Sequence, residues 1–175
     1  KKFKKYQDIF DKNNNSTPII FSKGKIIFFD QEDYVASIYK TNLKFEINPD
    51  SMKVTLKGVF LNDDLYINIQ SKKKDDQKIF DIIVKMSELG FLTKGNLFKS
   101  ERDKNTISGN LLIKKDKNKI SAIIDYKNDE LIINKSNLRN TFIDGELKGK
   151  ITLLPYFNFN LDVNLNSINF TKLYN

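Results

Sequence analysis

The sequence predicts an all-β protein built as one long, curved and mostly antiparallel sheet, preceded by a short amino-terminal helix. Apolar and polar residues alternate along most of the chain, and turns rich in Asp, Asn, Lys and Gly separate the alternating segments. The alternation is complete over residues 157–166, where every second residue is apolar. A period of two is the signature of a strand with one apolar and one polar face.

The chain divides into a short first unit and a long second one. In residues 1–16, Phe3, Tyr6 and Phe10 recur at near-helical spacing before a polar linker, which predicts an amphipathic helix. Residues 17–175 form the sheet. The segments expected as strands are 19–21 and 25–30 (a hairpin around a turn at 22–24), 35–48, 52–58, 65–70, 79–86, 91–98, 106–115, 119–127, 130–137, 141–154 and 157–166.

Glycine recurs inside the predicted strands in a loose internal echo. An apolar residue, a spacer, glycine, a spacer and a second apolar residue appear around Gly58, Gly109 and Gly149, with close variants at Gly95 and Gly145. Glycine within a strand marks a bulge, a bend or a close approach of another chain segment. The repetition predicts a sheet that curves repeatedly in the same sense.

Alternation alone leaves two architectures open. The apolar faces can pack against each other as the core of a closed β-sandwich or barrel. Alternatively, the sheet stays open and its apolar face remains available to a ligand. The best candidates for such a lining lie in the last strands, with support from an earlier one: Phe157, Phe159, Leu161, Val163, Leu165, Leu147, Ile151, Ile120, Ala122 and Ile124.

Composition argues against catalysis. The 175 residues contain no cysteine, histidine or tryptophan, so a thiol nucleophile, an imidazole base and the usual transition-metal ligands are missing from this sequence. No acidic loop of the calcium-binding type is present either. We therefore expect no enzyme activity, no cofactor and no metal site.

The net charge of +8 does not predict nucleic-acid binding. Arg102 and Arg139 are the only arginines, whereas specific readers of nucleic acid rely on arginine for bidentate contacts. The abundance of Lys, Asn, Ile and Phe is typical of an AT-rich genome. No stretch reaches the roughly 18 to 20 consecutive apolar residues of a membrane-spanning helix. Since the sequence begins with Lys1, we expect it to be cut from something longer, with any anchor outside it.

The order of the segments resembles that of AsmA-like proteins, which are related to TamB and to the bridge-like lipid transfer proteins. The resemblance covers the chain from about Pro18 onward. It rests on FSKGKIIFFDQEDYVASIYKTNLKF (21–45), VTLKGVF (54–60), LTKGNLF (92–98) and GELKGKITLLPYFNFNLDVNLNSINFTKLYN (145–175), with the closing pattern LDVNLNSINFTKLY (161–174).

The resemblance implies a repeating β-groove whose apolar lining shelters the acyl chains of phospholipids. It further implies a periplasmic protein, anchored in the inner membrane of a Gram-negative bacterium by a segment outside this chain. Its role would be phospholipid transport between the inner and outer membranes and outer-membrane biogenesis, with outer-membrane assembly proteins as further partners. The family offers no catalytic residues to carry over.

A second function from a different class follows from the closed architecture. A closed β-domain would act as a structural or protein-interaction module, pairing its edge strands with a partner. The two hypotheses differ in whether the apolar faces are open to a ligand or buried against each other.

Overall fold

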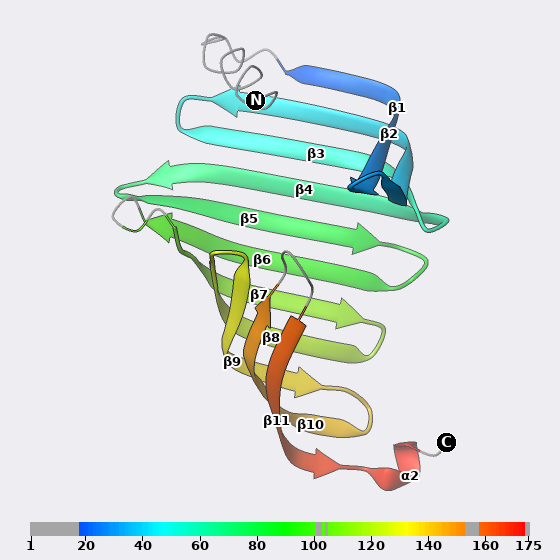
Figure 1. Cartoon of the computed structure of the whole chain (residues 1–175), viewed down its shortest axis with the longest axis vertical. Helices are drawn as coiled ribbons and strands as arrows, with labels where there is room; N and C mark the ends of the chain where they lie inside the picture. Colours follow the sequence, from blue (N-terminus) through cyan, green and yellow to red (C-terminus); the bar gives the residue numbers. More distant parts are fainter. Residues whose placement is uncertain (1–17, 101–102, 104, 153–157, 174–175) are drawn as a thin grey trace.

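The computed structural model describes residues 18–100, 103, 105–152 and 158–173, and folds them into a single sheet followed by one helical turn (Figure 1). The strands are β1 (Ile19–Asp30), β2 (Asp33–Asn48), β3 (Ser51–Phe60), β4 (Asp63–Lys74), β5 (Gln77–Met86), β6 (Phe91–Ser100), β7 (Ile107–Lys115), β8 (Asn118–Lys127), β9 (Glu130–Arg139), β10 (Ile143–Thr152) and β11 (Asn158–Ile168). The helical turn is α2 (Phe170–Leu173).

The sheet is an uninterrupted meander. Its strand order is the order of the sequence, from β1 to β11, and each strand pairs antiparallel with the next. The two end strands do not pair with each other, so the sheet is open. The all-β, antiparallel prediction is confirmed, and the closed sandwich or barrel is wrong. The predicted amino-terminal helix lies outside the described residues.

The register explains why alternating strands produce one continuous apolar surface. Residues opposite each other in an antiparallel pair project from the same face. The pairing therefore carries one face from strand to strand: Ile69 lies opposite Ile82, Ile82 opposite Gly95, Gly95 opposite Leu111, and Leu111 opposite Ala122. Five consecutive strands thus hold their apolar positions in phase.

The buried core is a set of neighbours within this one face. Ile38, Leu56, Leu65 and Met86 form its main cluster, on strands β2 to β5. In the part of the chain that the structure describes, strands make extensive contacts only with their immediate neighbours, and no second layer packs on the sheet. Side chains are therefore shielded by adjacent side chains of the same face rather than by an opposing one.

The first predicted hairpin is wrong. Residues 22–24 do not reverse the chain, because β1 continues through them and stays paired with β2 along its whole length. Lys23 has a φ of 56°, and the register shifts on both sides of Gly24. These are bulges, which bend a strand and increase its twist without ending it. In Figure 1 the paired ends of β1 and β2 accordingly bend sharply out of line with the rest of these two strands.

One buried carboxylate ties two turns of the meander together. Asp63, at the start of β4, accepts hydrogen bonds from the backbone N–H groups of Glu88 and Leu89 beyond β5, each at 3.0 Å. Its side chain is almost fully buried. Burial would raise the pKa of Asp63, but the hydrogen bonds from Leu89, Glu88 and their backbone neighbours outweigh it and lower the pKa.

The recurrent glycines mark close approaches, as the echo predicts, with one exception. A Cβ on Gly109 would lie 2.2 Å from the backbone oxygen of Asn96, and one on Gly149 would lie 2.1 Å from that of Asn160. Both glycines also have a positive φ. Gly95 differs, because the nearest atom to its Cβ would be Ile82 Cβ at an ordinary 3.5 Å.

We predict that Asp63 makes the stability of the fold pH-dependent. Because its pKa is lower in the folded state, the carboxylate stabilises the fold fully above its ordinary pKa of 3.8 and loses that contribution as the pH falls through the lowered value. Asp63→Asn should unfold at a lower urea concentration than the wild type at pH 7. That difference should shrink below pH 3.8. A difference that stays constant across this pH range would contradict the assignment.

The glycine contacts give a matched pair of substitutions. Gly109→Ala should destabilise the chain by about 2 kcal/mol, because the new methyl group meets backbone and the φ is strained. Gly95→Ala, on the neighbouring strand, should be neutral within about 0.5 kcal/mol. Urea unfolding followed by circular dichroism measures both. Equal effects of the two substitutions would show that the close approach at Gly109 is not a constraint.

Candidate functional site

The candidate site is the apolar face, defined as the side of the sheet on which the alternating hydrophobic residues meet. The register places the following residues on it: Leu43, Phe45, Val54, Leu56, Ile67, Ile69, Ile82, Val84, Leu97, Leu111, Ile113, Ile120, Ala122, Ile124, Leu131, Ile133, Leu147, Ile151, Phe159, Leu161, Val163 and Leu165. The face therefore extends without interruption from β2 to β11.

The structure brings together the predicted lining residues of β10 and β11. Phe159 lies opposite Ile151, and Val163 lies opposite Leu147. Leu161 and Leu165 lie opposite glycines, so their side chains have no bulky partner directly across the ladder. Phe157 lies outside the described residues.

The supporting residues of β8 lie on the same face, two strands from β10. Ile120, Ala122 and Ile124 each pair with a residue of β9, and Ile124 lies opposite Ile133. Ile133 in turn lies opposite Gly149 of β10. All the predicted lining residues that the structure describes thus belong to one surface.

The sequence prediction missed how far this surface extends. Leu56, Ile67 and Val84 belong to the apolar face on β3 to β5, and they are connected to β8 through β6 and β7. The signal for them was present, because residues 52–56 and 65–69 alternate as clearly as those of β11. Alternation shows that each strand has an apolar side, but the register is needed to show that the sides coincide.

The apolar face is most exposed at the two ends of the sheet. Phe21 on β1 is 56% exposed, and on β11 Phe159 is 61% and Val163 is 54% exposed. Toward the middle, most of the apolar residues are half-buried beside their neighbours. Contiguous exposed apolar patches of more than a few hundred Å² are rare on soluble monomers and mark sites of interaction.

The opposite face is polar and satisfies its own hydrogen bonds across the strands. Asn68 donates to the hydroxyl of Thr55 on β3 and accepts from Gln70 on its own strand, both at 3.0 Å. Asn96 on β6 donates to Asp81 on β5 at 2.6 Å. These hydrogen bonds satisfy the polar groups of this face, including the buried Asn68, and they stabilise the ladder from that side.

The polar face also carries an ion pair on β2. Lys44 Nζ lies 2.8 Å from Glu46 Oε1, two residues along β2 and on the same face. The hydrogen bond from Lys44 lowers the pKa of Glu46. Both side chains are partly exposed, so the pair contributes little to stability and keeps this face charged.

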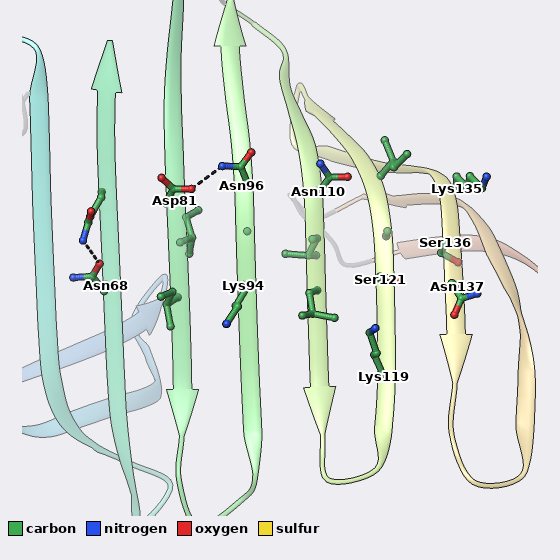
Figure 2. Close-up of a pocket in the computed structure, with 18 of the residues that line it drawn as sticks. Asn68, Asp81, Lys94, Asn96, Asn110, Lys119, Ser121, Lys135, Ser136 and Asn137 are labelled. Atoms are coloured by element: carbon green, nitrogen blue, oxygen red, sulfur yellow. Dashed lines mark hydrogen bonds between the residues drawn. The ribbon is translucent and has the colours of Figure 1, made fainter. Parts of the chain in front are cut away.

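A hollow of about 1070 Å³ lies over the middle strands, mostly on the polar face. Figure 2 shows polar side chains from six neighbouring strands around it: Asn68, Asp81, Asn96, Asn110, Ser121 and Asn137. Lys94, Lys119 and Lys135 also line it. Of the predicted lining residues, only Ala122 contributes. The hollow opens mainly on the polar face, where its amides, hydroxyls and ammonium groups lie beside the apolar side chains of Ile83, Leu112 and Ile123. It also reaches Ile82, Leu111 and Ala122 of the apolar face.

Comparisons with known proteins identify no relative: no family model, curated protein or solved structure matches the chain. Within the described residues, no helix is long and apolar enough to cross a membrane. No group of three or more acidic, histidine or cysteine side chains there is placed to hold a metal ion. A functional proposal for this chain therefore rests on the geometry of the two faces.

Two adjacent isoleucines of β8 test the assignment of the faces. Ile124 is buried on the apolar face, whereas Ile123 is 47% exposed on the polar face. Ile124→Asn should destabilise the chain by about 3 kcal/mol, since it removes a buried apolar group and desolvates an amide. Ile123→Asn should change stability by less than about 0.5 kcal/mol. Chemical denaturation measures both, and similar losses would contradict the assignment.

Proposed function

We propose that the apolar face binds the acyl chains of phospholipids, and that this chain is a non-enzymatic section of an AsmA-like protein that carries lipid between two membranes. One observation above all supports the proposal. Apolar positions of successive strands form one surface from β2 to β11, and nothing in the described part of the chain packs over it. A soluble protein rarely keeps so extended an apolar surface without something to cover it.

The energetics favour hydrocarbon as the covering. Burying one methylene group is worth about 0.8 kcal/mol, so a few methylenes of an acyl chain already give substantial affinity. Residues such as Ile69, Ile82 and Leu111 contribute aliphatic side chains without any polar group that hydrocarbon would leave unsatisfied. The polar face, with its own hydrogen bonds, stays in water.

The dimensions also fit. Strands in a sheet are about 4.8 Å apart, so eleven strands extend over about 50 Å. The hydrocarbon core of a bilayer is about 30 Å thick, which makes one acyl chain about 15 Å long. The face is therefore longer than a single acyl chain, and a lipid has adjacent positions of similar chemistry to move to.

Such a surface is suited to passage rather than to selection. Ligand sites gain specificity from a few well-placed polar groups among apolar ones. The apolar face offers aliphatic and aromatic side chains in succession. We therefore expect weak discrimination between lipids that differ only in their head groups, which a conduit requires.

The cellular setting follows from the resemblance of the sequence. We propose a periplasmic location, with attachment to the inner membrane by a segment outside this chain, and a role in outer-membrane biogenesis. Phospholipid transport between the inner and outer membranes is the matching activity. Outer-membrane assembly proteins are the proposed further partners.

The proposal predicts that lipid copurifies with the chain and is lost when the apolar face is charged. Native mass spectrometry and lipid extraction should detect phospholipid bound to the wild type. Leu161→Glu places a carboxylate on the apolar face and should reduce the bound lipid at least tenfold, because an ionised group is not transferred into hydrocarbon.

The matched control is Asn160→Glu, one residue away on the polar face, which should leave the bound lipid unchanged. Circular dichroism verifies that both variants keep the strand content of the wild type. Lipid-free wild type after expression in a Gram-negative host, with no uptake from phosphatidylglycerol and phosphatidylethanolamine vesicles, would contradict the proposal. So would equal losses in the two variants.

A further inference from the structure

The two edges of the open sheet differ in how well they are protected against pairing. Edge strands expose backbone N–H and C=O groups, and proteins usually protect them with lysines, prolines or bulges. β1 has such protection: Lys23 and Lys25 flank Gly24, and its register is broken three times. β11 contains no lysine, arginine or proline, and its pairing with β10 shifts only once, near its end.

The chemistry of β11 favours another strand of the same kind. Its polar side chains are four asparagines, one serine and a single charge, Asp162. Its apolar side chains remain exposed along most of the strand, with Val163 at 54% and Leu165 at 41%. A strand that pairs with β11 and extends the same two faces needs alternating apolar and uncharged polar residues, which β11 itself provides.

We propose that β11 is the site at which a second copy of this chain binds, through antiparallel β11–β11 pairing about a two-fold axis normal to the sheet. A two-fold axis in that direction keeps the apolar faces of both copies on the same side. Isologous two-fold contacts of this kind are the commonest way in which identical chains associate. The result is one antiparallel sheet in which the apolar face continues from one copy to the next.

Full overlap of the two strands sets the register, and the position of the single charge opposes one of the two neighbouring registers. Full overlap of Asn158–Ile168 with its symmetry mate places Val163 on the two-fold axis, because Val163 is the middle residue of the strand. In this register, Asp162 lies opposite Asn164 of the second copy. A shift by one position would place the axis at Asp162 and set the two carboxylates directly opposite each other, which is unfavourable.

Sedimentation velocity on the lipid-free chain tests the proposal first. The wild type should sediment as a species of two chains in reversible equilibrium with one chain. Single chains at concentrations up to about 100 µM, where even a weak dimer is populated, would overturn it. Larger assemblies that grow without limit would also overturn it, because they require the β1 edge.

Charge substitutions at Asn164 test the register. Asn164→Asp sets like charges opposite each other twice in the dimer and should raise its dissociation constant roughly tenfold. Asn164→Lys pairs with Asp162 of the second copy and should leave the constant unchanged or lower it. Both substitutions are made in a Glu146→Gln variant, and their dissociation constants are compared with that of this variant. The background is needed because Glu146 lies opposite Asn164 within one chain, where it would interact with the new charge.

The edge control is Ser22→Asp in β1, which should not change the dissociation constant. Circular dichroism verifies folding of every variant. A dimer that Ser22→Asp weakens, or that responds equally to Asp and Lys at position 164, would overturn the assignment to β11.

Discussion

The structure depends on one constraint: each strand must keep its register with the strands beside it, because no second layer is present in the described chain to fix it. A slip of one residue would move all the apolar side chains of a strand to the polar face. Irregularities are therefore local and compensated. Where β9 and β10 lose register, the hydroxyl of Ser136 donates to the backbone oxygen of Leu147 and accepts from its N–H, both at 2.6 Å.

The same constraint explains why the two faces differ in chemistry. Polar side chains of one face form hydrogen bonds across neighbouring strands. Asp63 connects the turn before β4 to the turn after β5. The hydrophobic side chains do not hold two layers together, so their face stays uncovered in the described part of the chain. Domains usually bury such a face against a second layer. In our proposal, hydrocarbon takes the place of that layer.

The strands were predictable, whereas their arrangement in space was only partly so. Alternation and turn residues located β11 and most other strands, because the period of two is a local property. The bend of β1 was mistaken for a hairpin, since Ser22-Lys23-Gly24 has the composition of a turn and acts as a bulge. Alternation could not separate an open from a closed sheet. The hollow beside Asn96 and Ser121 was not predictable, because side chains from several neighbouring strands form it together.

The most direct test of the central claim asks what each face touches when phospholipid is present. The chain has no cysteine, so single cysteines at Val84 and Lys85, neighbours on opposite faces of β5, can carry a nitroxide label. With phospholipid bound, the account predicts that the label at position 84 is accessible to oxygen and shielded from a water-soluble nickel complex, and that the label at position 85 behaves in the opposite way. Equal access of the nickel complex to both labels would contradict it.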